Sequence, residues 1–270
     1  MRFFDNFMFR FIRVVGPRIR WLRLCKGHRH ITLPARTGTT VGHRSLPAVE
    51  FVAHPVTSPR LVIIYPGLNA TVDGECRSFN QANPLRYVHL ADRVQRERVA
   101  AVLRVANPPC GYYGGGQVAV DRLARVIDYA LGHARDLCGR RHPELCLLGF
   151  SAGAGAAAAL AGEYRPSRML LVAPAGDAGP QRIIDGLKDY SGKLVLLVGE
   201  RDEVVGRDSA CLFDRLSPAA QPKEVHFVPD CDHFFTRPEH DQLLNETSLR
   251  VFAGTGNCEV NQPERRPDPA

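Results

Sequence analysis

The sequence has no CxxC pair and no group of cysteine and histidine residues at metal-ligand spacing, although it contains eight cysteines in 270 residues. Without such pairs neither a zinc site nor a thioredoxin-like redox motif is predicted. Scattered cysteines without a secretory signal are typical of reduced thiols, so we expect a cytoplasmic protein with no bound metal. The cysteines are Cys25, Cys76, Cys110, Cys138, Cys146, Cys211, Cys231 and Cys258.

Nucleotide-binding motifs are also missing. The sequence contains no GxGxxG, and the glycine run at residues 114–116 is not followed by the lysine of a phosphate-binding loop. Glycines alone do not provide the lysine that contacts the β- and γ-phosphates. We therefore predict no nucleotide and no other cofactor.

The N-terminal stretch has no apolar run long enough to span a membrane, because arginines interrupt it, and no cleavage site of small residues follows it. Residues 1–26 place aromatic and aliphatic side chains on one helical face and arginines on the other. Such a helix fits a peripheral contact with an anionic membrane as well as packing on the domain itself. A transit peptide shares the arginine-rich character, but serine is absent from this stretch. These interpretations stay open.

Net charge is unevenly placed along the chain. Residues 1–30 hold eight Arg or Lys and one Asp, which accounts for the whole formal net charge of +7 and leaves the rest of the chain neutral. A nucleic-acid-binding domain is expected to carry its positive charge across a folded face. We therefore predict no nucleic-acid partner.

From residue 30 onward, short apolar runs alternate with stretches of helical periodicity. This alternation predicts a single α/β domain with a mainly parallel central sheet flanked by helices, and the continuous apolar runs are typical of strands buried on both faces. The predicted strands are 30–34, 47–54, 61–65, 99–105, 145–149, 169–173, 194–199 and 224–228, and the predicted helices are 85–97, 118–138, 152–163, 179–189, 207–216 and 239–252.

Three regions follow from this pattern. Residues 1–29 form the basic amphipathic segment and residues 30–254 the α/β domain. Residues 255–270 are rich in Pro, Asn, Glu and Arg and lack apolar periodicity, so we predict a disordered tail.

A G-x-S-x-G motif, Gly149-Phe150-Ser151-Ala152-Gly153, lies between the predicted strand 145–149 and the predicted helix 152–163. At such a sharp turn, glycines two residues on either side relieve crowding, and the serine stands exposed above the sheet. Ser151 is therefore the predicted nucleophile. The backbone N–H of Ala152, at the helix start, is predicted to face an oxyanion, and Phe150 is predicted to line the substrate pocket.

A serine hydroxyl needs a neighbouring base, and in this kind of arrangement the histidine follows the nucleophile and the acid along the chain. Three histidines follow Ser151. His226 lies inside a predicted strand, and His240 lies beside Glu239 in a predicted helix, where we expect it to be solvated. His233 follows directly after a predicted strand, so we predict that it is the base.

An acid that orients the base should follow an earlier strand. The segment Lys193 to Val205 contains an apolar strand with carboxylates at its carboxyl end. Asp202 is the predicted acid, and Glu200, Glu203 and Asp177 remain alternatives.

These segments, GFSAG, VGERDEVV and PDCDHFF, resemble the α/β-hydrolase superfamily in order and spacing, and the small lid-poor esterases in particular. The resemblance covers roughly residues 45–252 and implies an α/β-hydrolase fold with a small or absent cap. Members of this superfamily take a second oxyanion donor from the loop after an early strand. The matching loop begins Tyr65-Pro66 instead of the usual His-Gly. It makes the N–H of Leu68 the first implied donor, and Asn69 is close enough to contribute by its side chain or its backbone.

Two features bear on the substrate. Tyr112 and Tyr113 lie in a glycine-rich loop after the predicted strand 99–105 and are predicted to contact substrate. The connection between predicted strands 169–173 and 194–199, where the superfamily commonly inserts large lids, is short. By fold analogy, we expect an open pocket for acyl groups of modest size.

The sequence therefore predicts a serine hydrolase, carboxylesterase-like or thioesterase-like, that cleaves a small-molecule ester or thioester through an acyl-enzyme on Ser151. The same three residues also fit an acyltransferase or a peptidase. A non-catalytic binding module with this fold, which has no working oxyanion hole, is the alternative from a different class.

Overall fold

A computed structural model describes residues 23–25, 27–41, 44–68, 70–75, 83–107 and 115–253. Most of the predicted amphipathic helix and all of the predicted tail at 255–270 lie outside the described residues, so a membrane contact of residues 1–26 stays a prediction. Among the helices that are described, none is both long and apolar enough to cross a membrane.

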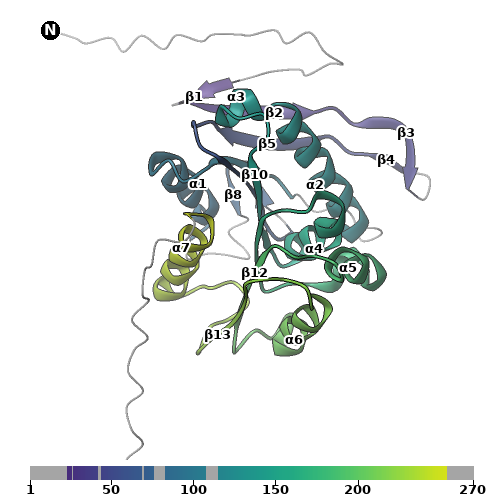
Figure 1. The fold of residues 1–270 in the computed structure, drawn as a ribbon, viewed down its shortest axis with the longest axis vertical. Coiled ribbons are helices and arrows are strands. Elements are labelled where there is room, and N and C mark those ends of the chain that lie inside the picture. The colour runs from purple at the N-terminus through teal and green to yellow at the C-terminus, as the bar shows by residue number, and fades with distance from the viewer. Residues whose placement is uncertain are drawn as a thin grey trace, which may run out of the picture.

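A nine-stranded sheet forms the centre of the molecule (Figure 1). The strands from β9 onward in the spatial order run parallel to one another, whereas β1, β2 and β5 add an antiparallel edge. In spatial order the strands are β1 (Arg23–Cys25), β2 (His28–Leu33), β5 (Val49–His54), β9 (Ala101–Val105), β6 (Arg60–Tyr65), β10 (Glu144–Phe150), β11 (Arg168–Val172), β12 (Lys193–Gly199) and β13 (Lys223–Val228).

The antiparallel edge begins earlier than the sequence pattern indicates. β1 is a strand inside the stretch predicted as an amphipathic helix, and β2 begins at His28, before the predicted start of the domain at residue 30. Two small two-stranded sheets were also not predicted, because their strands are short and lack an alternating apolar pattern. They are formed by β3 (Arg36–Val41) with β4 (Arg44–Leu46), and by β7 (Ala70–Thr71) with β8 (Gly74–Glu75).

Helices cover both faces of the sheet. In Figure 1, α1 and α7 lie on one side of it, and α2, α4, α5 and α6 lie on the other. The predicted helix 118–138 is divided, because α2 ends at Gly132, a weak helix former, and a separate α3 follows. The helices are α1 (Arg86–Arg96), α2 (Gly115–Gly132), α3 (Ala134–Cys138), α4 (Ala152–Tyr164), α5 (Pro180–Leu187), α6 (Gly206–Leu216) and α7 (Pro238–Ala253), with a short 3₁₀ turn, η1 (Gly176–Ala178).

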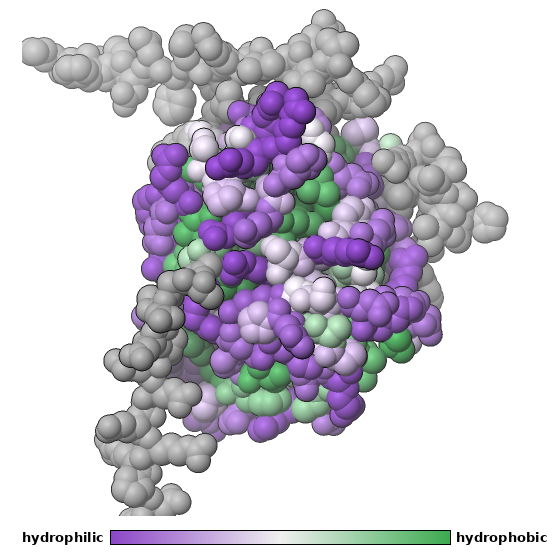
Figure 2. Space-filling view, viewed as in Figure 1, coloured by the Kyte–Doolittle hydropathy of each residue, from purple (hydrophilic) through white to green (hydrophobic). Residues whose placement is uncertain are grey.

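The sheet separates two apolar cores. Leu61 and Ile63 of β6 pack in the core beneath α2, α4 and α5, whereas Val62 and Ile64 pack in the core beneath α1 and α7. Successive side chains of a strand point to opposite faces, so a strand buried on both sides requires a continuous apolar run. Outside these cores, hydrophilic residues occupy most of the face drawn in Figure 2.

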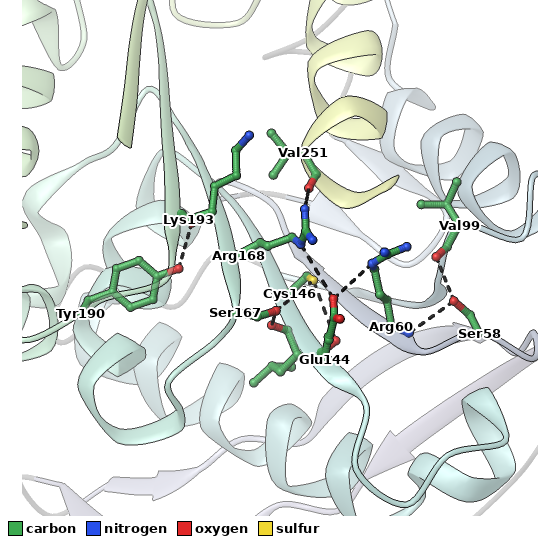
Figure 3. Close-up of polar contacts among 11 residues, drawn as sticks. Ser58, Arg60, Val99, Glu144, Cys146, Ser167, Arg168, Tyr190, Lys193 and Val251 are labelled. Atoms are coloured by element: carbon green, nitrogen blue, oxygen red, sulfur yellow. Dashed lines mark hydrogen bonds and ion pairs between the residues drawn. The ribbon is translucent and has the colours of Figure 1, made fainter. Parts of the chain in front are cut away.

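A polar network ties together the amino-terminal edge of the parallel strands (Figure 3). The carboxylate of Glu144 on β10 accepts a hydrogen bond from Arg60 Nε on β6 at 3.2 Å and lies 3.9 Å from Arg168 Nε on β11. Arg168 in turn donates to the carbonyl of Val251 on α7 at 3.1 Å. The network joins three strands and a helix at the edge opposite to Ser151.

Arg86 is a charged residue in the apolar core, with 0% of its side chain exposed. Its Nε donates to Asp241 Oδ1 of α7 at 2.6 Å, and one terminal nitrogen donates to the Phe235 carbonyl at 2.9 Å. A buried charge is tolerated only when it is paired and hydrogen-bonded. Arg86 therefore holds α1, α7 and the loop that carries His233 together.

We expect Asp241→Ala to lower the free energy of unfolding by about 3–5 kcal/mol, because it leaves the buried Arg86 guanidinium without its counter-charge. The matched control is Glu97→Ala, which removes the exposed pair of Arg93 and Glu97 on α1 and should cost about 0.5 kcal/mol or less. Urea denaturation of both variants measures the difference. Equal losses would contradict this account of Arg86.

Candidate functional site

Ser151 lies at the point where β10 leaves the sheet and α4 begins. Its backbone has φ 53° and ψ −119°, a conformation that is strained for a residue with a side chain. Neighbouring backbone groups hold this turn. The Ser151 N–H donates to the Val172 carbonyl at 2.9 Å, and the Ser151 carbonyl accepts from the Ala154 N–H at 2.9 Å and from the Ala175 N–H at 3.1 Å.

The two glycines of the motif are required by close approach of the backbone. A Cβ on Gly149 would lie 2.5 Å from Ala154 Cα, and a Cβ on Gly153 would lie 2.1 Å from the Tyr65 carbonyl oxygen. Real Cβ atoms do not come this close to backbone atoms. The glycines therefore let α4 start directly against β10 and β6, which projects Ser151 from the carboxyl edge of the sheet.

Three side chains from separate loops meet at this edge. His233 Nε2 lies 3.1 Å from Ser151 Oγ, and His233 Nδ1 lies 2.8 Å from Asp202 Oδ2. Only 5% of the His233 side chain and 0% of the Asp202 side chain are exposed. Each residue follows the carboxyl end of a parallel strand, β10, β12 or β13, so the sheet itself brings them together.

The carboxylate of Asp202 is held on both oxygens. Oδ2 faces the imidazole, and Oδ1 accepts the N–H groups of Val204 and Val205, both at 2.9 Å. Burial alone would raise the pKa of the Asp202 carboxyl, but the hydrogen bonds from His233 and the two backbone N–H groups hold this pKa below its usual value. Asp202 is therefore ionised at neutral pH and orients the imidazole.

The alternative acids lie elsewhere. Glu200 pairs with Arg207 at 3.3 Å, and Glu203 and Asp177 are exposed. In the part of the chain that the structure describes, the carboxylate that contacts His233 is that of Asp202.

The alternative histidines are also separate from this contact. His226 is exposed on β13 and pairs with Glu224 at 3.0 Å. The prediction that His240 is solvated is wrong, because this residue on α7 is buried, with 7% of its surface exposed. A periodic pattern places a residue on a helix, but the packing of that helix decides which turn is covered.

Two backbone segments border Ser151 where an oxyanion would form. Ala152 is the first residue of α4, so its N–H has no acceptor within the helix. In the loop after β6, a Cβ on Gly67 would lie 3.4 Å from Ser151 Cβ, which places this loop directly beside the serine. Leu68 follows in the same loop, and Asn69 lies outside the described residues.

Asn107 supports this loop and was not predicted. Its side chain is fully buried, donates from Nδ2 to the Pro66 carbonyl at 3.1 Å and accepts at Oδ1 from the Tyr65 hydroxyl at 3.2 Å. Its backbone N–H also donates to the Ala70 carbonyl at 2.8 Å. An asparagine two residues after a buried apolar strand, at the carboxyl edge, is the signal that could have identified it.

The predicted pocket residues are only partly described. Phe150 is 3% exposed, and its ring lies 5.3 Å from the His233 ring and 6.3 Å from the Tyr87 ring, centroid to centroid. Phe234, the next residue in the same loop, packs edge-on against the His233 ring, with 5.0 Å between the ring centroids, a contact that the sequence did not indicate. Tyr112 and Tyr113 lie outside the described residues. Substrate contact by Phe150 and the two tyrosines stays a prediction.

Similarity to solved structures agrees with this architecture. An α/β serine hydrolase without a lid from Xanthomonas campestris superposes with a TM-score of 0.59 at 19% identity, covering 86% of this chain and 99% of that one. A cold-adapted esterase from an Arctic intertidal metagenomic library gives 0.60 at 12% identity, covering 86% and 97%. An esterase domain from Rhodothermus marinus gives 0.55 at 15%, covering 83% and 96%.

These likenesses show that the chain has the α/β-hydrolase fold, with a mostly parallel sheet between two layers of helices. Between β11 and β12 the chain forms only η1 and α5, as the short connection in the sequence predicts. The sequence matches neither a protein-family model nor a curated protein.

We expect Gly153→Ala to destabilise the protein by at least about 2 kcal/mol, because its methyl group would overlap the Tyr65 and Pro66 carbonyls. Gly132→Ala, at the exposed end of α2, is the matched control, because no atom lies within 4 Å of its added Cβ. It should be neutral or stabilising. Thermal unfolding of both variants checks this, and an unchanged midpoint for Gly153→Ala would disprove the packing argument.

Proposed function

We propose that this protein is a serine hydrolase that cleaves a carboxylic ester or thioester through an acyl-enzyme on Ser151. The observation that carries the proposal is the continuous hydrogen-bonded chain from Ser151 Oγ through the His233 imidazole to the Asp202 carboxylate. This arrangement converts a weak hydroxyl nucleophile into a reactive one.

In the first half of the reaction, His233 Nε2 accepts the proton of Ser151 as Oγ attacks the substrate carbonyl carbon. The carbonyl oxygen becomes an oxyanion that accepts hydrogen bonds from the N–H groups of Ala152 and Leu68. The tetrahedral intermediate then expels the alcohol or thiol, which takes the proton from the imidazolium. Asp202 stays ionised throughout and stabilises that imidazolium.

In the second half, a water molecule replaces the leaving group. His233 accepts a proton from this water, whose oxygen attacks the acyl carbon of the ester on Ser151. The second tetrahedral intermediate collapses to release the carboxylic acid, and Ser151 Oγ regains its proton from the imidazolium.

The surroundings of the site favour accessible acyl groups of modest size. Val204, two residues after Asp202, is 63% exposed, and Leu68, which follows Gly67 in the loop beside Ser151, is 45% exposed. Large apolar side chains at this exposure offer a surface for a short acyl chain, and the short β11–β12 connection adds no large lid. Transfer to an alcohol or thiol and peptide cleavage use the same three residues, and product analysis distinguishes them from hydrolysis.

We expect Ser151→Ala and His233→Ala each to lower kcat for p-nitrophenyl acetate by at least about 10³-fold, because either change removes the activated nucleophile. His226→Ala, a change to an exposed histidine on β13, is the matched control and should retain full activity. A fluorophosphonate probe should label the wild type and the control but not Ser151→Ala. A folded wild type that neither turns over esters nor reacts with the probe would support a binding module instead.

The role of Asp202 can be tested by comparison with the neighbouring Glu203. We expect Asp202→Asn to lower kcat by roughly 10⁴-fold, because an amide favours the wrong tautomer of His233. Glu203→Gln removes an adjacent exposed carboxylate and should change kcat less than about twofold. Steady-state kinetics on esters checks both variants. A larger loss of kcat in Glu203→Gln than in Asp202→Asn would indicate that Glu203 is the acid.

A further inference from the structure

Two histidines and an aspartate meet at the edge of the sheet opposite to Ser151. His28 begins β2, His54 ends β5, and Asp92 lies on α1. His28 Nε2 is 3.2 Å from Asp92 Oδ1, and His54 Nδ1 is 3.3 Å from the same oxygen. His54 lies beside Val102, near the start of the parallel strand β9, which places this cluster at the amino-terminal edge of the parallel strands.

Protein groups alone leave this cluster incompletely bonded. The His54 side chain is 0% exposed, yet neither of its ring nitrogens makes a hydrogen bond of good geometry. Asp92 Oδ1 is also buried without such a bond, although 41% of the Asp92 side chain is exposed. Buried polar atoms without partners cost about 1–3 kcal/mol each, so three of them at one point require an explanation.

A metal ion would provide that explanation. A neutral imidazole has a ring nitrogen with a free lone pair, which is the form that binds metal ions. The His54 side chain is fully buried, and both of its ring nitrogens lack a hydrogen bond of good geometry.

The spacing of the three ligand atoms fits a tetrahedral ion. Bonds of about 2.0–2.1 Å to imidazole nitrogen and carboxylate oxygen separate neighbouring ligand atoms by about 3.3–3.4 Å in a tetrahedron. Asp92 Oδ1 lies 3.2 and 3.3 Å from the two imidazole nitrogens, which is close to this edge, and the three ligand atoms all lie within 4.8 Å of one another.

A fourth ligand position lies next to the same atoms. The Gln95 amide on α1 donates from Nε2 to the Pro55 carbonyl at 2.8 Å, and this bond turns its Oε1 toward His28 Nε2, 3.1 Å away. The amide oxygen, or a water molecule entering from the exposed side of Asp92, would complete the coordination.

We propose that His28, His54 and Asp92 bind one divalent transition-metal cation, with zinc the best fit. Two imidazoles and one carboxylate suit zinc, whereas calcium and magnesium require mainly oxygen ligands. One charge opposes binding: Arg104 lies on the neighbouring strand β9, where its guanidinium donates to the Val72 carbonyl.

The bound cation would act as a structural clamp rather than in the hydrolysis proposed for Ser151. It would join the antiparallel edge strands β2 and β5 to α1, at the opposite edge of the sheet from Ser151. The ligands come from three separate segments of the chain, so no short sequence motif indicates them.

The test uses the full-length, tag-free chain, stripped with EDTA and then dialysed against Zn²⁺ alone, with bound metal and thermal unfolding measured. We expect about one equivalent of zinc and a higher unfolding midpoint, because the ion binds the folded state. Asp92→Asn and His28→Gln should each weaken zinc binding by at least about tenfold. Asp92 and His28 are the chosen positions because both side chains are partly exposed, so these variants should fold, whereas His54 is fully buried.

The matched control is His89→Gln, which removes an exposed histidine on the same helix α1 and should bind zinc like the wild type. Co²⁺ in place of Zn²⁺ should give the visible absorption of a tetrahedral site in the wild type and in His89→Gln, and not in Asp92→Asn. Absence of zinc binding, or binding that Asp92→Asn and His28→Gln retain at full strength, would overturn the proposal.

Discussion

The arrangement of side chains at the carboxyl edge of the sheet depends on the close contact between α4 and the strands β10 and β6. Gly149 and Gly153 permit it, since a methyl group on either residue would overlap backbone atoms. The contact forces Ser151 into a strained backbone conformation, which the Val172 carbonyl and the Ala154 and Ala175 N–H groups hold in place. Because the turn is fixed in this way, Ser151 Oγ meets an imidazole that comes from a different loop.

That imidazole is placed by interactions well outside the serine turn. Asp202 binds it on one side, Phe150 and Phe234 pack on its ring, and Arg86 anchors the same loop through the Phe235 carbonyl. The apolar cores on both faces of the sheet fix the strands relative to one another. Each loop begins where one of these parallel strands ends, so the cores also fix where the loops begin. The strained backbone conformation of Ser151 is therefore maintained by apolar packing across the whole domain.

The two edges of the sheet differ in chemistry. At the carboxyl edge, the polar side chains of Ser151, His233 and Asp202 are hydrogen-bonded to one another, an arrangement suited to proton transfer. At the amino edge, Glu144 and its arginines form ordinary ion pairs, whereas His54 and Asp92 Oδ1 lack hydrogen-bond partners. The hydrolytic site proposed at one edge and the cation site proposed at the other therefore share no residue.

Local pattern determined much of this protein. The apolar runs predicted the buried strands β6, β9, β10, β11 and β12 because such strands need apolar residues on both faces, and the G-x-S-x-G motif located the turn at Ser151 because only glycine fits there. The extended β1 and the division of the helix after Gly132 did not follow from periodicity, because tertiary contacts override weak local preferences. Only the tertiary structure decided that Asp202, rather than Glu200 or Glu203, faces His233, that Asn107 supports the loop after β6, and that His28, His54 and Asp92 meet. Each of these depends on contacts between segments far apart in the chain, which cannot be predicted from residue spacing or composition.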